Sequence, residues 1–287
     1  MTIDKPFLIT SSDLSPTVVA RDFQRIHRGV YTDPGADLAP IDAIRAAWLR
    51  AGPGAVVGGV SAARMYGVSF YRDANRLELL RCPTGQGREL DNIRVVRTDL
   101  DPCDVLTLDG MPVTSPIRTA YDLGRRTPAW SALGYLDALT HATDIDLGRL
   151  WRFIVDHPRT RGIRQIRGLV PWIDPKAESF GESWMRLLVL AADLPRPETQ
   201  VVIRDASGRK IARFDHAYRA EKIAFEFDGF DYHYSDEQRE SDAARDRATA
   251  DLGWHTERRN SVQLGDDPIG FVTRIERLRD ERAPRRR

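Results

Sequence analysis

Residues Ala212 to His233 read ARFDHAYRAEKIAFEFDGFDYH, and this segment decides the fold of the C-terminal part of the 287-residue chain. Side chains along a β-strand alternate between its two faces. In the run 223–228 the hydrophobic side chains at every second position therefore point into a core, while Glu226 and Asp228 emerge together on the opposite face. The segment thus predicts a strand that buries one face and gathers carboxylates on the other.

A tight connection near residues 218–221 is expected to lay this strand antiparallel to the one before it, with Asp215 opposite Glu226. Like charges directly opposed across strands destabilise a sheet unless something neutralises them, and a divalent cation is the usual solution. Carboxylate oxygens select Mg²⁺ or Mn²⁺. The hairpin therefore predicts a metal site.

The remainder of the last third supports an α+β (mixed α/β) fold, with a mixed sheet flanked by helices. A polar helix is expected over 236–252, and the pair Asp267-Pro268 is typical of a cap and first turn of a final helix. The elements expected in order are a helix (178–192), strands (200–204, 210–217 and 222–228), the polar helix, a strand after Gly253, and the final helix.

The length and composition of the chain restrict the kind of protein it can be. The chain is long enough for two domains, and 41% hydrophobic residues supply their cores. No run approaches the roughly 18 apolar residues of a membrane span, and the N-terminus lacks the apolar segment of a secretory signal. Two cysteines without metal-ligand spacing suit a reducing compartment. We therefore expect a cytoplasmic protein with no membrane partner.

The basic residues are almost all arginine. Of 43 Lys and Arg residues only four are Lys, while the net charge is only +1. The planar guanidinium matches phosphate geometry and would suit nucleic-acid contact. A GC-rich genome produces the same bias, so the arginine content leaves DNA binding open.

Several C-terminal phrases occur in a fixed order. They are GESWMRLLVLAADLPRPETQV (181–201), RFD (213–215), FEFDGFDYH (225–233) and SDAARDRATADLGWH (241–255). In this order they resemble the very-short-patch-repair-endonuclease-like domain of unknown function, a branch of the PD-(D/E)xK restriction-endonuclease superfamily. The resemblance covers about 110 residues and implies a restriction-endonuclease-like domain at 175–287.

The resemblance implies a set of site residues. Asp215 would be the metal-binding aspartate and Glu226 the (D/E) position. Glu182 on the preceding helix would be the additional acid, with Glu178, one turn earlier, as a substitute. A Mg²⁺ or Mn²⁺ ion held there would bind a phosphate oxygen and lower the pKa of a bound water.

The chain departs from the superfamily pattern at the lysine, because that position is Asp228. A third acid could ligate a second ion, so Asp228 joins the expected metal ligands. Lys222 lies on the alternate-residue register that shares the polar face with Glu226. His233, five residues past Asp228, corresponds to a general acid or base in the repair-endonuclease pattern, and its ordinary pKa suits that role.

Structural alternatives stay open for these residues. Glu226 and Asp228 are equally typical of the wet face of a half-exposed strand. Glu182 has a possible i,i+4 partner in Arg186, and His233 suits a simple turn.

Two arginines on the polar helix are candidate phosphate contacts. Arg245 and Arg247 would bind the DNA backbone. Ion pairs with Asp242 and Asp246 are the alternative.

The N-terminal half carries phrases of a second family. RIHRGVYTDP (25–34), GAVVGGVSAARMYGV (54–68) and VTSPIRTAYDLGRR (113–126) resemble the N-terminal parts of actinobacterial AbiEi-type antitoxins. The resemblance implies a trimmed winged-helix-like segment at 1–36 and an AbiEi-like α+β and helical region at 37–174.

Two functions follow from these observations. The first is a Mg²⁺-dependent DNA endonuclease or nickase. The alternative is a non-catalytic DNA-binding antitoxin or autorepressor of the AbiEi type, with a nuclease-like domain and a cognate toxin of the nucleotidyltransferase type. A third, structural role without nucleic acid is open at this near-neutral charge.

Overall fold

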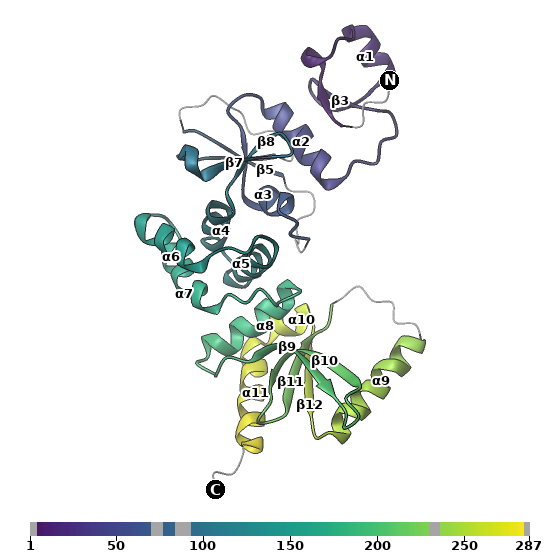
Figure 1. Cartoon of the computed structure of the whole chain (residues 1–287), viewed down its shortest axis with the longest axis vertical. Coiled ribbons are helices and arrows are strands. Elements are labelled where there is room, and N and C mark those ends of the chain that lie inside the picture. The colour runs from purple at the N-terminus through teal and green to yellow at the C-terminus, as the bar shows by residue number, and fades with distance from the viewer. Residues whose placement is uncertain (1–4, 70–76, 84–92, 230–235, 284–287) are drawn as a thin grey trace. The chain divides into compact units, whose positions relative to one another are not determined.

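The computed structural model describes residues 5–69, 77–83, 93–229 and 236–283 (Figure 1). The mixture of helices and sheets confirms the predicted α+β fold class. The three-part domain division expected from the sequence stays a prediction. The chain falls into two compact units, described separately below: Met1–Arg125 with Ala142–Arg161, and Arg126–His141 with Gly162–Arg287.

The N-terminal unit contains two sheets. One has three antiparallel strands in the order β1-β3-β2, and the other has five strands in the order β6-β5-β4-β8-β7 with mixed directions. The elements are β1 (Phe7–Leu8), η1 (Ile9–Ser11), α1 (Pro16–Asp22), β2 (Gln24–His27), β3 (Val30–Thr32), α2 (Pro40–Ala51), β4 (Val56–Val57), α3 (Gly59–Met65), β5 (Leu77–Arg81), β6 (Ile93–Arg97), η2 (Pro102–Asp104), β7 (Val105–Leu108), β8 (Met111–Thr114), α4 (Pro116–Gly124) and α6 (Leu147–Asp156).

Helix α4 is fixed to the sheet of this unit by its cap and by one buried arginine. Ser115 accepts the N–H of Arg118 at 3.2 Å, and Pro116 occupies the first turn, as expected for a helix start. The buried guanidinium of Arg118 donates to Asp104 at 3.0 Å and to Asp122 at 2.9 Å. A buried arginine that satisfies two carboxylates ties α4 to the start of β7.

The C-terminal unit is built on one four-stranded sheet. Strands β9, β10 and β11 form an antiparallel meander, and β12 pairs parallel to β11. The order is β12-β11-β10-β9. The elements are α5 (Ala129–Thr143, which enters this unit up to His141), α7 (Ile163–Leu169), η3 (Val170–Trp172), α8 (Phe180–Ala191), β9 (Glu198–Arg204), β10 (Lys210–Tyr218), β11 (Ile223–Phe227), α9 (Asp236–Asp251), β12 (His255–Arg259), α10 (Ser261–Asp266) and α11 (Pro268–Arg282).

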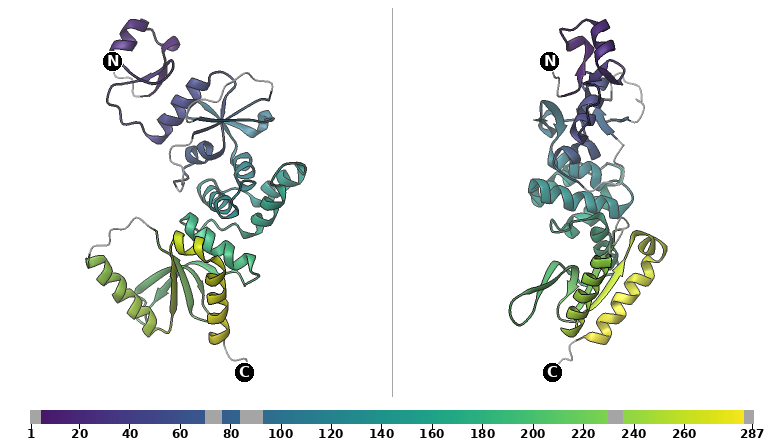
Figure 2. Two further views of the ribbon diagram at one scale, coloured as in Figure 1. Left: turned by 180° about the vertical axis from the view of Figure 1, so that it is seen from behind. Right: turned by 90° about the vertical axis from the view of Figure 1, so that its right-hand side faces the viewer.

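Helices cover both faces of this sheet. Helix α9 lies along one face, and α8 and α11 lie along the other (Figures 1 and 2). The predicted order of helix, three strands, helix, strand and final helix is confirmed, and the short α10 is added before the last helix. A parallel strand that returns after a helix places β12 beside β11, the strand that carries Glu226.

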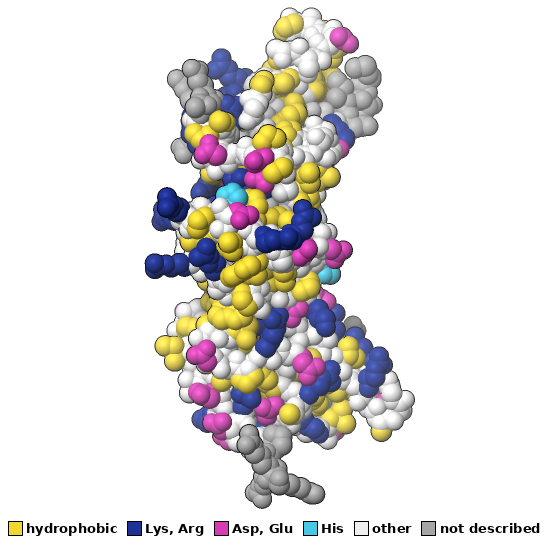
Figure 3. Space-filling view, turned by 60° about the vertical axis from the view of Figure 1, so that its left-hand side comes forward, with side chains coloured by type: hydrophobic (Ala, Val, Ile, Leu, Met, Phe, Trp, Pro, Cys, Tyr) yellow, Lys and Arg dark blue, Asp and Glu magenta, His cyan; other side chains and the backbone are white. Residues whose placement is uncertain are grey.

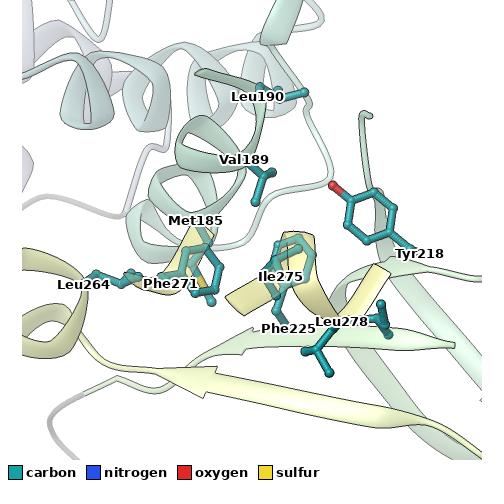
Figure 4. Packing of buried hydrophobic residues seen from close by; sticks show 10 residues of the cluster. Met185, Val189, Leu190, Tyr218, Phe225, Leu264, Phe271, Ile275 and Leu278 are labelled. Atoms are coloured by element: carbon teal, nitrogen blue, oxygen red, sulfur yellow. The ribbon is translucent and has the colours of Figure 1, made fainter. Parts of the chain in front are cut away.

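The core of the C-terminal unit lies between the sheet and the helices α8 and α11 (Figure 4). Phe225 of β11 packs edge-on against Phe271 of α11, with ring centroids 5.9 Å apart. This confirms that the hydrophobic face of the 223–227 strand is buried. The buried members are Met185, Val189, Leu190, Tyr218, Ile223, Phe225, Leu264, Phe271, Ile275 and Leu278.

A buried ion pair joins α5 to α8. Asp137 and Arg186 are both fully buried, and the guanidinium bonds directly to the carboxylate. The same carboxylate accepts the hydroxyl of Ser183 at 2.5 Å and the N–H of Asp174 at 2.8 Å. Burial raises the pKa of Asp137 to about 6, against the lowering effect of Arg186. Multiple partners are what a buried charge requires.

None of the helices within the described residues is both long and apolar enough to cross a membrane.

Two helical glycines provide a matched test of the packing. An added Cβ at Gly134 would lie 1.8 Å from the ring of Phe180, whereas one at Gly168 would meet nothing within 4 Å. We expect Gly134→Ala to lower the free energy of unfolding by about 1–3 kcal/mol through overpacking. Gly168→Ala should raise it by up to about 1 kcal/mol, because alanine favours the helix. Chemical denaturation measures both, and equal stabilities would contradict the close packing of α5.

Candidate functional site

The β10–β11 hairpin brings the central acids together. His216 pairs with Phe225 in the antiparallel register, so Asp215 and Glu226 lie one residue beyond the last pair, at the same end of the hairpin. The predicted antiparallel arrangement is therefore confirmed. Both residues therefore lie where the regular pairing of β10 and β11 ends.

Asp215 is a half-buried acid beside two buried acids, Glu182 and Glu226. Its Oδ2 accepts the backbone N–H of Phe227 at 2.9 Å. Burial and the neighbouring charges of Glu182 and Glu226 raise the pKa of Asp215 to about 8, although the bond from Phe227 and the charge of Arg213 oppose this. The carboxyl is thus held in a place that favours its neutral form at neutral pH.

Glu182 approaches Asp215 from α8. It lies in the first turn of the helix, where Ser179 caps the N-terminus by accepting the N–H of Glu182 at 3.1 Å. The Glu182 Oε2 accepts the N–H of Glu178 and the side-chain amide of Gln200, each at 2.9 Å. Burial raises its pKa. The alternative ion pair with Arg186 is wrong, because Arg186 bonds to Asp137 instead.

The backbone carbonyl of Glu182 is bound by a buried histidine, His216. The Nε2 of His216 lies 2.9 Å from the carbonyl oxygen of Glu182. Burial lowers the pKa of His216 to about 3, so the ring is neutral and Nε2 can donate to this carbonyl. A bond from β10 to α8 therefore places Glu182 beside the strand that carries Asp215.

Glu226 is buried and bound to arginine. It is 7% exposed, so the expectation of a wet strand face is wrong for this residue. The Nε of Arg258 donates to Glu226 Oε2 at 3.0 Å, and Arg245 lies 3.6 Å from the same oxygen. Burial raises the pKa of Glu226, and the two arginines oppose the rise.

The remaining predicted acids and bases are less central. Asp228 is half-buried just after β11, and its backbone N–H donates to the carbonyl of Arg259 at 3.0 Å. Glu178 is paired with Arg213 through two bonds of 2.7 Å. His233, the predicted general acid or base, lies outside the described residues.

The structure places Lys222 away from the acids. It occupies a turn with a φ of 51° before β11, and its ammonium donates to the carbonyl of Leu252 at 2.7 Å. Four residues of strand, about 13 Å, separate it from Glu226. Lys222 is therefore not brought to the acids, and its place on a polar face shared with Glu226 stays a prediction.

The two arginines of α9 differ in position. Arg245 lies between Glu226 and Asp246, at 3.6 Å and 3.9 Å. Arg247 is exposed. The ion-pair alternative is thus confirmed for Arg245 with Asp246, and phosphate contact by Arg247 stays a prediction.

Sequence reasoning missed Arg258 and its anchor. Arg258 makes two 2.7 Å bonds to Asp246 of α9 as well as its bonds to Glu226. The hydrogen bonds to Asp246 and the charge of Glu226 raise the pKa of Arg258, which is charged at any working pH. The only sequence signal was an arginine in the strand expected after Gly253.

Carboxylate oxygens are the right donors for Mg²⁺ or Mn²⁺, but their arrangement is incomplete for metal binding. Across residues 5–69, 77–83, 93–229 and 236–283, no group of three or more His, Cys, Asp or Glu side chains is placed to hold a metal ion. Glu226 instead forms an ion pair with Arg258. The described side chains therefore do not by themselves form the predicted metal site.

Asp215 makes stability depend on pH. Folding raises the pKa of Asp215, so the protonated carboxyl stabilises the folded state. This contribution to the free energy of unfolding is fully present below the ordinary pKa of an aspartate and is lost as the pH rises through about 8. Asp215→Asn keeps an acceptor for the Phe227 N–H without a charge. Between pH 5 and pH 9 the free energy of unfolding should fall in the wild type. We expect this fall to be smaller in Asp215→Asn, by on the order of 2 kcal/mol.

Denaturation at the two pH values measures this difference. Asp205→Asn, in the exposed β9–β10 turn, makes the same chemical change and should keep the wild-type pH dependence. Equal losses of stability in the wild type and Asp215→Asn between the two pH values would contradict a raised pKa for this acid.

Comparison with known proteins finds two curated relatives. Two curated Mycobacterium tuberculosis proteins, uncharacterized protein MT2308 (strain CDC 1551 / Oshkosh) and uncharacterized protein Rv2248 (strain H37Rv), are each 29% identical over 147 residues. The match covers 51% of this chain and 54% of each relative, so the chain spans about half the length of the curated relatives it matches.

A solved structure and a family model also match. The crystal structure of the RV2827C protein from Mycobacterium tuberculosis has a TM-score of 0.40 and 16% identity, covering 67% of this chain and 78% of that one. The family match begins just before β4 and ends within η3, short of α8 and the acids. Residues 55–171 match the family described as the AbiEi antitoxin C-terminal domain.

Proposed function

We propose that this chain is a DNA-binding antitoxin or autorepressor of the AbiEi type, acting with a cognate toxin of the nucleotidyltransferase type. The match of residues 55–171 to the AbiEi antitoxin C-terminal domain carries this proposal. In this role the C-terminal unit is a nuclease-like binding module. A fold of this kind is compatible with loss of catalysis, because function depends on the site rather than on the architecture.

The N-terminal segment offers a surface for DNA. The β2–β3 hairpin turns at Gly29, whose φ of 81° favours glycine, and it presents the exposed Arg25 and Arg28. Helix α1 is the only α-helix among residues 5–36. A hairpin with two exposed arginines suits the wing of a trimmed winged helix, which contacts the phosphate backbone.

The distribution of charge favours a local contact over a broad basic surface. The face shown in Figure 3 intersperses Lys and Arg with Asp and Glu. The net charge of +1 agrees with this pattern. DNA binding by this chain therefore depends on a few defined arginines and on salt.

Charge reversal tests the hairpin. We expect the double variant Arg25→Glu/Arg28→Glu to bind the DNA upstream of its own coding sequence at least tenfold more weakly, because two phosphate contacts become repulsive. The slope of log affinity against log salt should fall by about 2. Fluorescence anisotropy at several salt concentrations measures both quantities.

Arg94→Glu is the matched control, because it reverses an exposed charge on β6 of the same unit. It should leave binding within about twofold of the wild type. Absence of wild-type binding to this DNA at low salt would remove the proposal.

Three clustered acids, of which two are buried and Asp215 is half-buried, favour a second candidate function, a metal-dependent DNA endonuclease or nickase. Glu182, Asp215 and Glu226 gather at one end of the β10–β11 hairpin, and each pKa is raised. A cation would relieve such a cluster. In this role Asp215, Glu226 and Asp228 would hold the ion. A bound Mg²⁺ or Mn²⁺ would supply an activated water and charge stabilisation at phosphorus.

Plasmid cleavage tests this second function. With Mg²⁺ or Mn²⁺, the wild type should nick or cut supercoiled DNA, and Asp215→Ala or Glu226→Ala should reduce the rate at least a hundredfold, since each removes a ligand. Asp205→Ala, an acid in the exposed β9–β10 turn, should cut at the wild-type rate. Intact plasmid after incubation with pure wild type would sink the nuclease hypothesis and leave the antitoxin proposal standing.

A further inference from the structure

The acid cluster lacks the lysine of the superfamily-like pattern, yet it has a cation. Strand β12 pairs parallel to β11 with Glu226 and Arg258 as direct partners. The register therefore brings an arginine of one strand to the acid of the next. Both nitrogens of Arg258 that face the acid are within 3.0 Å of Glu226 Oε2.

Arg258 is held in this position from a third element. Its two terminal nitrogens bond to the two carboxylate oxygens of Asp246 on α9, each at 2.7 Å. This bidentate geometry orients the planar guanidinium and leaves its Nε to face Glu226. Arg258 thus bridges β12, β11 and α9, and it does so as a fixed charge rather than a mobile surface side chain.

Equal numbers of acidic and basic side chains meet around Arg258. Two carboxylates, Glu226 and Asp246, face two guanidiniums, Arg258 and Arg245. Glu226 has only 9% of its side chain exposed, so it needs such a partner. A divalent ion at Glu226 would have to share its oxygen with the half-buried guanidinium of Arg258, and the two cations would repel each other.

We propose that Arg258 is the built-in cation of the acid cluster, and that a divalent cation binds at Glu226 only by displacing it. The inference uses the acid cluster of the second candidate function but does not require cleavage. Arg258 is a positioning residue here: anchored by Asp246, it compensates the charge of Glu226 when no metal is present. The arginine on a neighbouring strand takes the place of the absent lysine.

Manganese binding by the full chain tests this proposal. Binding is measured from the electron paramagnetic resonance signal of free Mn²⁺, with no DNA present. We expect Arg258→Gln to bind Mn²⁺ at least tenfold more tightly than the wild type, because it frees a carboxylate and removes a positive charge. Arg258→Lys keeps the charge and should stay within threefold of the wild type.

A neighbouring arginine gives the matched control. Arg259 has the same 28% side-chain exposure as Arg258 but bonds to Glu257. Arg259→Gln removes the same charge and should leave Mn²⁺ affinity within threefold of the wild type. Adding Glu226→Gln to Arg258→Gln should abolish the gain, which locates it at Glu226.

Folding of each variant is checked by circular dichroism. If Arg258→Gln does not fold, Arg258→Met, which retains the apolar stem, carries the same expectation. A folded Arg258 variant that binds Mn²⁺ no more tightly than the wild type would overturn the proposal, as would an equal gain in Arg259→Gln. Failure of plasmid cleavage bears only on the nuclease function, so the two results are distinguishable.

Discussion

The buried pair between Asp137 and Arg186 is the constraint on which the candidate site depends. A charged pair without access to water is tolerated only when further hydrogen bonds satisfy it, and Ser183 and Asp174 supply them to Asp137. Ser183 and Arg186 lie in the turn of α8 that follows Glu182. The pair therefore fixes α8 against α5, and α8 in turn carries an acid to the sheet.

Burial, rather than solvent, then sets the chemistry of the acids. Glu182, Asp215 and Glu226 each have a raised pKa, because desolvation penalises their charged forms more than their partners restore them. Hydrogen bonds from Gln200 and Phe227 hold the first two in place. Among the described residues, Glu226 is the one of these three acids with arginine ion pairs, whereas Arg213 acts on Asp215 through its charge.

The two proposed functions rest on different parts of the chain. The AbiEi-type match covers residues 55–171 and ends before α8, whereas the acid cluster lies wholly in the C-terminal unit. In the proposed antitoxin role, the pairing of Glu226 with Arg258 is consistent with a module that binds without cutting. In the second candidate function, a metal ion is proposed to bind only by displacing Arg258 from Glu226. Function depends on the side chains of the site rather than on the fold.

The sequence by itself determined the order of elements in the C-terminal unit and the hairpin that brings Asp215 to Glu226. Alternation along 223–227 and short connections are local, so periodicity reveals them. Tertiary structure decided the partners. Arg258 is 32 residues from Glu226 and reaches it through a parallel pairing formed across α9. Lys222, only four residues away, bonds instead to the carbonyl of Leu252. Local patterns do not encode the register between strands that a crossover helix separates, so the charge partner of Glu226 appeared only in the folded chain.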